Sequence, residues 1–279
     1  MYKFGIIGYP LGHSLSAVIQ KSAFESMNID ATYEVLETPP ENLIDRIKFL
    51  KRNDFNGFNV TIPLKVPVSL FVNEIDDDAN IAGCVNTVKI TENKEFYGYN
   101  TDIYGFVSAI PKDVDLSGKC AAILGTGGAS RAAAVGLIKK GIQEIDLYTR
   151  NIINSQNAIN YLRNQFPAIK FEAKQIQNVR DISKYSIIVN ATPIGMRGFA
   201  MDETPLELNV IKTAKPDTVI YDIVYNPIKT VLLQYAEKCG LRTVEGLDML
   251  IYQAEKAINI WTGMSPDVKT MKIAALQAL

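Results

Sequence analysis

The sequence predicts an α/β protein of two domains, and three observations lead to this expectation. The chain has 279 residues, which is more than one typical domain and few for three. Short apolar runs typical of strands alternate with helical patterns, as in βαβ units with mostly parallel sheets. A glycine-rich turn at residues 125–128 directly follows one of these runs.

The first hundred residues alternate between strand and helix patterns and end in a hairpin. The helix expected over residues 14–27 presents Leu15, Val18, Ile19 and Ala23 on one face, at the spacing of an amphipathic helix. The elements expected in this part are strands at 3–8, 31–37 and 58–61, helices at 14–27 and 41–52, and hairpin strands at 85–90 and 95–99.

The remaining residues continue the alternation. Gly141 is expected to end the alanine-rich helix at 129–140, because glycine readily adopts the conformation that terminates a helix. The elements expected in this part are strands at 120–124, 145–149, 187–190, 219–222 and 242–245, and helices at 102–110, 129–140, 153–165, 230–239, 247–261 and 267–279.

Composition and charge exclude several kinds of partner. The 29 basic and 30 acidic side chains nearly cancel, so no net field attracts nucleic acid or an anionic membrane. No apolar stretch approaches the roughly 20 residues of a membrane helix, and the N-terminus does not read as a signal peptide. Three widely spaced cysteines fit reduced thiols in the cytoplasm. His13 is the single histidine, so neither a His-based triad nor a multi-His metal site is expected.

The glycine turn predicts a dinucleotide site. Gly125 permits the tight turn, and Gly127 leaves room for a diphosphate beside the N–H groups of the next helix. Ser130 stands where the usual third glycine would be, so the match to the fingerprint is partial. Arg150 lies where an NAD site usually has a carboxylate, and a cation there favours the 2′-phosphate of NADP. An exposed surface arginine is the alternative.

Clusters of polar residues interrupt apolar segments of the first hundred residues. Ser14 and Ser16 open a helix, where one serine is readily explained as an N-cap and two hydroxyls also suit a carboxylate. Lys65 follows a buried strand at a helix start, which the helix dipole disfavours. Asp102 opens another helix, where capping is the simplest explanation. Gln253 lies on an otherwise apolar helix.

These segments, taken together and in order, resemble the shikimate dehydrogenase family, which interconverts 3-dehydroshikimate and shikimate with a nicotinamide cofactor. The resemblance spans nearly the whole chain. The residues that carry it are Ser14-Leu15-Ser16, Asn59-Val60-Thr61-Ile62-Pro63-Leu64-Lys65, Val85-Asn86-Thr87, Asn100-Thr101-Asp102, Gly125-Thr126-Gly127-Gly128-Ala129-Ser130, Asn190-Ala191-Thr192-Pro193, Asp222-Ile223-Val224-Tyr225-Asn226-Pro227 and Gly246-Leu247-Asp248-Met249-Leu250-Ile251-Tyr252-Gln253-Ala254.

The resemblance implies an NADP-dependent oxidoreductase of the shikimate pathway, which supplies chorismate and the aromatic amino acids. It implies a substrate domain at residues 1–101 and 247–279 and a Rossmann-like NADP-binding domain at residues 102–246. We expect small-molecule ligands only, and a monomer or homodimer in the cytoplasm. Lys65 and Asp102 would form the catalytic pair. The expected substrate-binding residues are Ser14, Ser16, Thr61, Asn86, Gln253 and Tyr225, with Ser14 and Ser16 on the carboxylate. The expected cofactor-binding residues are Gly125, Gly127, Gly128, Ala129, Ser130, Arg150, Thr192 and Gly246.

Some positions depart from the family pattern. Ala17, Gln20 and Lys21 replace a common Pro and His-Asn pair, and Asn154 replaces a second basic residue near the adenosine phosphate. The second change leaves dual use of NAD open. The alternative functions are a quinate/shikimate dehydrogenase with dual cofactor use and, from another class, a non-catalytic ligand-sensing module. Retention of both Lys65 and Asp102 argues against the sensor, because a sensor needs no proton-transfer pair.

Overall fold

The computed structural model describes residues 1–12 and 14–279 of the chain, and these residues form two compact units. One unit comprises Met1–Gly105 with Ile251–Leu279, and the other comprises Phe106–Leu250. The chain passes between the units inside two helices, α4 (Thr101–Ala109) and α9 (Gly246–Thr262). None of the helices in the described residues is both long and apolar enough to cross a membrane.

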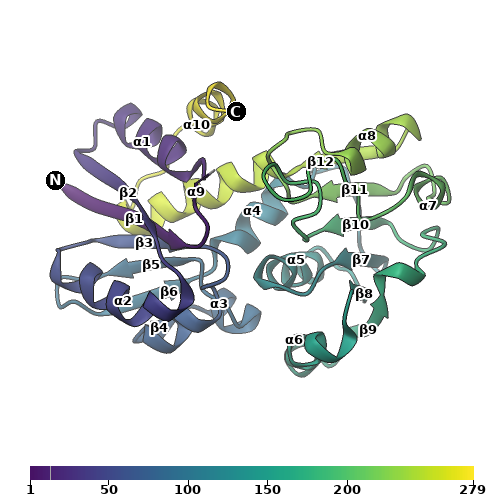
Figure 1. Ribbon diagram of the computed structural model, residues 1–279, viewed down its shortest axis with the longest axis horizontal. Coiled ribbons are helices and arrows are strands. Elements are labelled where there is room, and N and C mark those ends of the chain that lie inside the picture. Colours follow the sequence, from purple (N-terminus) through teal and green to yellow (C-terminus); the bar gives the residue numbers. More distant parts are fainter. Residues whose placement is uncertain (13) are drawn as a thin grey trace. The chain divides into compact units, whose positions relative to one another are not determined.

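The first unit is built on a six-stranded mixed sheet in the order β2-β1-β3-β5-β6-β4 (Figure 1). The strands β1, β2 and β3 are parallel, and the β5–β6 hairpin, expected from the sequence, adds antiparallel neighbours. Its elements are β1 (Tyr2–Gly8), α1 (Ser16–Ser26), β2 (Ala31–Glu37), α2 (Leu43–Arg52), β3 (Gly57–Val60), β4 (Glu74–Ile75), α3 (Asp77–Ala82), β5 (Thr87–Ile90), β6 (Phe96–Tyr99) and α10 (Val268–Gln277), with 3-10 turns at Pro40–Asn42 and Pro67–Phe71.

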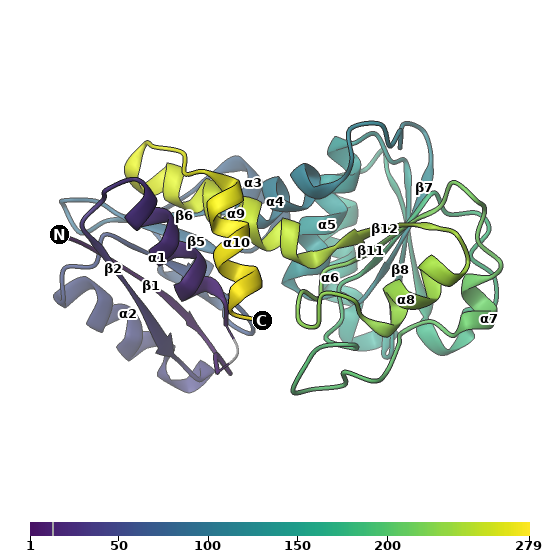
Figure 2. The same ribbon diagram turned by 90° about the horizontal axis from the view of Figure 1, so that it is seen from above.

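The C-terminal helices pack on the first unit, and an aromatic residue of α9 contacts its sheet. The Trp261 ring of α9 stacks on Phe4 of β1 with ring centroids 4.5 Å apart, and its Nε1 donates to the Val88 carbonyl at 3.0 Å. Gly57 in β3 makes room for this ring, since a Cβ there would lie 2.4 Å from Trp261 Nε1. The helices α1, α9 and α10 lie together over one face of the sheet (Figure 2), and α10 packs directly on α1.

The second unit contains a fully parallel sheet in the order β12-β11-β10-β7-β8-β9. Counted from β7, this is the order 3-2-1-4-5-6 of a Rossmann fold, whose connections reverse direction between β7 and β10. Apolar clusters cover both faces of the sheet. Its elements are β7 (Cys120–Leu124), α5 (Gly128–Lys139), β8 (Glu144–Thr149), α6 (Ile152–Gln165), β9 (Lys170–Gln175), a 3-10 turn at Ile176–Asn178, β10 (Ile187–Asn190), α7 (Leu208–Ile211), β11 (Val219–Asp222), α8 (Val231–Lys238) and β12 (Arg242–Glu245).

Candidate active site

A lysine and an aspartate from different elements form an ion pair in the first unit. Lys65 follows β3 and Asp102 lies in the first turn of α4, and Lys65 Nζ is 2.5 Å from Asp102 Oδ2. Their side chains are 17% and 8% exposed, so the pair is largely shielded from water. Partial burial reduces screening by solvent and salt, which strengthens such a charge-assisted hydrogen bond.

The side-chain amide of Asn86 has a fixed orientation beside this pair. The backbone N–H of Thr101 donates to Asn86 Oδ1 at 2.7 Å, and only an oxygen can accept that bond. Asn86 Nδ2 must therefore face the other way, where it donates to Asp102 Oδ1 at 2.8 Å. Both oxygens of Asp102 thus accept hydrogen bonds, one from Asn86 and one from Lys65. Gln253 joins the group from α9, with Oε1 3.5 Å from Asn86 Nδ2.

Buried hydrogen bonds continue from Asn86 to the strands β3 and β2 and to the helix α1. Thr87 Oγ1 donates to Asn86 Oδ1 at 3.1 Å and accepts from Asn59 Nδ2 at 3.0 Å. Asn59 Oδ1 in turn accepts from the Tyr33 hydroxyl at 2.7 Å and from Gln20 Nε2 at 3.4 Å. These side chains are at most 5% exposed, and polar groups so deeply buried are usually hydrogen-bonded, although Gln20 Oε1 has no partner among the described residues. We call this set, from Gln20 and Tyr33 to Asp102 and Lys65, the buried polar network.

The two serines reach this network through Tyr33. Ser16 is the first residue of α1 and is buried. Burial raises the pKa of Tyr33 well above its ordinary value, and interaction with the nearby Ser16 side chain lowers it in part, so the phenol stays protonated at neutral pH. Ser14 is half-buried, and its Oγ accepts from the Ser16 backbone N–H at 3.3 Å. Thr61 is also half-buried and directly follows β3.

The glycine loop of the second unit leads from β7 into α5. Gly125 has φ of +109°, a backbone conformation that residues with a side chain rarely adopt. A Cβ there would lie 3.1 Å from the Ala191 carbonyl oxygen. A Cβ on Gly127 would meet nothing within 4 Å, so this side of the loop is open. The first residues of α5, Gly128, Ala129 and Ser130, present the N-terminus of a twelve-residue helix. These features fit the diphosphate of a dinucleotide, which binds at the N-terminus of a helix where the backbone leaves open space.

Thr192 and Arg150 follow the strands on either side of β7. Thr192 comes after β10, and its hydroxyl donates to Asn190 Oδ1 at 2.7 Å. Its Cγ2 would lie 3.2 Å from a Cβ on Gly125, so the two predicted cofactor residues are close neighbours. Arg150 follows β8 and is exposed. Ligands of this fold bind at the carboxyl ends of the strands, near the reversal between β7 and β10.

A buried carboxylate supports the loop that carries Tyr225. Asp222 is 0% exposed and accepts from Thr230 Oγ1 at 2.6 Å, from Asn190 Nδ2 at 2.9 Å and from the Val224 N–H at 3.0 Å. Burial raises the pKa of Asp222 to about 7 despite these bonds. Tyr225 is half-buried directly after this segment, and burial also raises its pKa. The structure gives Gly246 a packing role, because a Cβ there would lie 2.2 Å from the Ile223 carbonyl oxygen.

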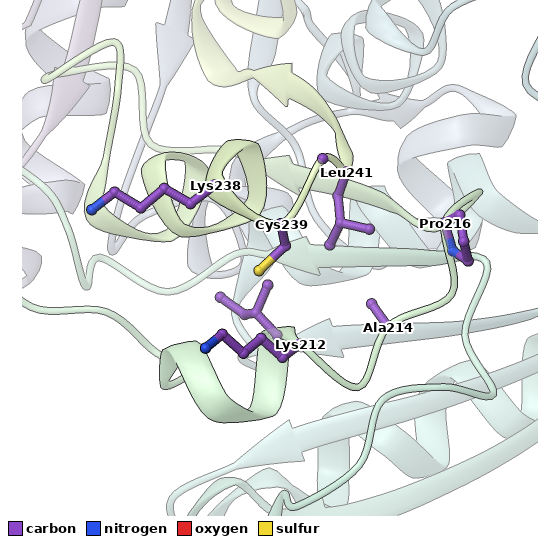
Figure 3. Close-up of a pocket in the computed structure, with 8 residues that line it drawn as sticks. Lys212, Ala214, Pro216, Lys238, Cys239 and Leu241 are labelled. Carbon is purple, nitrogen blue, oxygen red and sulfur yellow. The ribbon is translucent and has the colours of Figure 1, made fainter.

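A shallow cavity of about 270 Å³ lies elsewhere in the second unit (Figure 3). It is lined by the end of α8 and the segment after α7, including Lys212, Lys238 and Cys239. Leu241, which also lines it, immediately precedes β12, so the cavity lies at the amino ends of the strands. The glycine loop lies at their carboxyl ends, and the cavity is therefore separate from the candidate site.

The chain matches two family models and many curated proteins. The model of the shikimate dehydrogenase substrate binding domain matches residues 6–88, and that of the shikimate 5′-dehydrogenase C-terminal domain matches residues 246–276. A shikimate dehydrogenase (NADP(+)) from Archaeoglobus fulgidus is 37% identical over 279 residues, covering 100% of this chain and 99% of the relative. The chain belongs to the shikimate dehydrogenase family.

Solved structures agree with this membership. The Thermus thermophilus shikimate 5-dehydrogenase in complex with NADP(H) and shikimate has a TM-score of 0.86 and 32% identity, covering all of both chains. The quinate dehydrogenase of Corynebacterium glutamicum in complex with NAD has a TM-score of 0.89 and 26% identity, covering 99% of each chain. The family and the fold inferred from the sequence are thereby confirmed, together with the oxidoreductase class and the NADP cofactor.

Several residues of the site carried no usable signal in the sequence. Tyr33 is one residue of an ordinary strand pattern, and only the fold shows that it touches both Ser16 and Asn59. Gln20 was noted as a departure from the family pattern, yet its place in the network depends on the packing of α1 against the sheet. His13 and the side chain of Asn154 lie outside the described residues.

Proposed function

We propose that this protein catalyses the reversible, NADPH-dependent reduction of 3-dehydroshikimate to shikimate. The single observation that carries the proposal is the shielded ion pair of Lys65 and Asp102, with Asn86 fixed beside it. Reduction of a ketone develops negative charge on oxygen, which a nearby cation stabilises and a proton donor neutralises. An ammonium group held by a carboxylate supplies both functions.

The other polar residues of the first unit would bind the substrate. Ser14 and Ser16, at the start of α1, suit the carboxylate, because hydroxyls and helix N–H groups both donate to an anion. Thr61, Asn86 and Gln253 offer the donors and acceptors that ring hydroxyls require. Lys65 would donate its proton to the carbonyl oxygen, and Asp102 would hold the ammonium toward it. In the reverse reaction the neutral amine would accept the proton of the shikimate hydroxyl.

The second unit would hold NADP, which supplies the hydride when bound. Gly125, Gly127, Gly128, Ala129 and Ser130 would bind the diphosphate, and Arg150 would bind the 2′-phosphate of the adenosine. Thr192 would line the nicotinamide side, and Tyr225 would bind the substrate. We assign the substrate side to residues 1–101 and 247–279, and the cofactor side to residues 102–246.

The same proposal includes the setting in which the enzyme works. We infer a cytoplasmic monomer or homodimer with small-molecule ligands only. Cys84, Cys120 and Cys239 are free thiols, which supports a reducing compartment. Size-exclusion chromatography with light scattering decides between monomer and dimer.

A spectrophotometric assay with purified protein tests the reaction. Shikimate with NADP⁺ should produce reduced nicotinamide, and quinate should react much more slowly. A quinate/shikimate dehydrogenase is the second candidate, because the chain also resembles a quinate dehydrogenase bound to NAD and has Asn154 where a second cation is common. Equal kcat/KM with NAD⁺ and NADP⁺ would favour that candidate. Absence of turnover with either acid would overturn both and favour a ligand sensor.

A further inference from the structure

Three hydroxyl side chains meet behind the glycine loop of the second unit. Thr126 belongs to the loop, Thr149 ends β8, and Ser155 lies in the first turn of α6. Ser155 Oγ is 2.9 Å from Thr126 Oγ1 and 2.7 Å from Thr149 Oγ1. We refer to these three residues as the hydroxyl cluster.

The cluster is also bonded to the turn after β8. Both Ser155 Oγ and Thr149 Oγ1 lie within hydrogen-bonding distance of the Asn151 carbonyl oxygen, at 2.9 and 3.3 Å. In the contacts of Ser155 with Thr126 and Thr149, either hydroxyl can be the donor. Thr149 Oγ1 in turn accepts from the Asn151 backbone N–H at 3.3 Å. Ser155 Oγ thus contacts the glycine loop, the end of β8 and the following turn.

The cluster connects the two parts of the chain that would contact the adenosine half of the cofactor. Arg150 lies between Thr149 and Asn151, both of which the cluster holds, and its own side chain is exposed. Thr126 lies between Gly125 and Gly127 in the diphosphate loop. Ser155 itself is only 5% exposed, so it acts from behind these segments. A displacement of the 150–151 turn relative to the loop would move the Arg150 cation away from a 2′-phosphate.

We propose that Ser155 is a positioning residue that sets the preference of this protein for a 2′-phosphorylated adenine dinucleotide. It fixes the turn of Arg150 relative to the diphosphate loop, so a nucleotide can contact both at once. This inference rests on the proposed NADP cofactor. It adds a residue that allows Arg150 alone to distinguish NADP from NAD. A nucleotide without the 2′-phosphate contacts the loop alone, so its affinity does not depend on the position of the Arg150 turn.

Calorimetric titration of the purified protein, without substrate, tests the assignment. The probes are 2′,5′-ADP, which carries the 2′-phosphate, and 5′-AMP, which does not. Ser155→Ala should weaken 2′,5′-ADP binding by about five- to tenfold, the size expected for one lost charge-orienting contact, and leave 5′-AMP within about twofold. Thr126→Val removes the same connection from the loop side and should give the same selective loss. The double variant should lose no more than either single variant, because both changes break one connection.

Thr218→Val is the matched control. Thr218 is a fully buried hydroxyl of the same unit that donates to the Tyr185 carbonyl at 2.9 Å, just before β11. It should change neither affinity. Equal losses for 2′,5′-ADP and 5′-AMP in Ser155→Ala would overturn the inference, because they indicate a general scaffold role. A wild-type protein without preference for 2′,5′-ADP would overturn it as well. A wild-type protein that prefers 2′,5′-ADP but does not oxidise shikimate would refute the proposed reaction and leave the inference supported.

Discussion

The Lys65 site of the first unit and the glycine loop of the second unit are built in different ways. Around Lys65, side chains from α1, β2, β3, β5 and α4 join one buried network of directed hydrogen bonds. The glycine loop instead offers backbone N–H groups, an open face at Gly127 and few side chains. A reacting ketone needs directed charge and a proton, whereas a diphosphate needs donors and space. Side-chain changes should therefore act most strongly in the first unit, and backbone changes in the second.

Lys65→Ala should have the largest effect. Loss of the proton donor should lower kcat by about 10²- to 10⁴-fold, the range for general acid–base groups. Calorimetry should show NADP⁺ binding that is unchanged, because the cofactor would use the other unit. Lys48→Ala, at an exposed lysine paired with Asp45, is the control and should retain full activity. Near-normal turnover in Lys65→Ala would remove this residue from the proposed mechanism.

Asp222→Asn tests whether burial disfavours the charged form of the Asp222 carboxyl group. Because the pKa of Asp222 is raised from 3.8 to about 7, the folded protein binds this proton more tightly than the unfolded chain does. Its contribution to stability is therefore present at low pH and is lost as the pH rises toward 7. The wild-type unfolding free energy, relative to that of the variant, should fall by roughly 2–3 kcal/mol between pH 5 and pH 8.

Urea unfolding of both proteins at the two pH values measures this difference. Subtraction of the variant removes the titrations that the two proteins share. A difference that is independent of pH would show that Asp222 is already ionised in the folded protein at pH 5.

Gly127→Ala should weaken NADP⁺ binding to the second unit without lowering the stability of the fold. The added Cβ meets no protein atom within 4 Å, and φ at this position is −82°, so the melting temperature should not change. The methyl group would occupy space that the diphosphate needs, and NADP⁺ affinity should fall about tenfold, or about 1.4 kcal/mol. Gly125→Ala is the contrasting variant and should lower the melting temperature, because φ there is +109°. Unchanged NADP⁺ affinity in Gly127→Ala would contradict the placement of the diphosphate.

Tyr33→Phe should produce the smallest effect and tests whether the buried polar network positions the substrate. The change removes one hydrogen bond to Asn59 and one contact with Ser16, and KM for shikimate should rise roughly fivefold, as for a lost contact of about 1 kcal/mol. Both kcat and KM for NADP⁺ should remain within about twofold of the wild type. Tyr148→Phe, at a buried tyrosine bonded to Tyr185 in the other unit, should leave KM for shikimate unchanged. Equal effects of the two variants would argue against a positioning role for Tyr33.

Much of the fold could be predicted because hydrophobic periodicity is local. The strands Ala31–Glu37, Cys120–Leu124, Ile187–Asn190, Val219–Asp222 and Arg242–Glu245 have the expected bounds. The strand β9 was missed because it is an edge strand rich in charge, whose Lys170 and Lys174 pair with neighbouring carboxylates. Charged edges discourage pairing with other chains, and they also hide the strand signal from a pattern search. The short helix α3 was missed as well, since it has only six residues.

The sequence by itself determined the family, the alternation of strands and helices, and the identity of the chemical groups. Motifs such as Asn59 to Lys65 and Gly125 to Ser130 are contiguous, so the residues alone display them. Only the tertiary structure decided which groups touch. Lys65 and Asp102 are 37 positions apart, and Asn86 and Gln253 are 167 apart, yet each pair lies within hydrogen-bonding distance. The orientation of the Asn86 amide depends on a backbone donor. The contacts of Thr126 and Thr149 with Ser155 depend on the packing of a helix. Such directional contacts arise when distant segments fold together, and no local pattern encodes them.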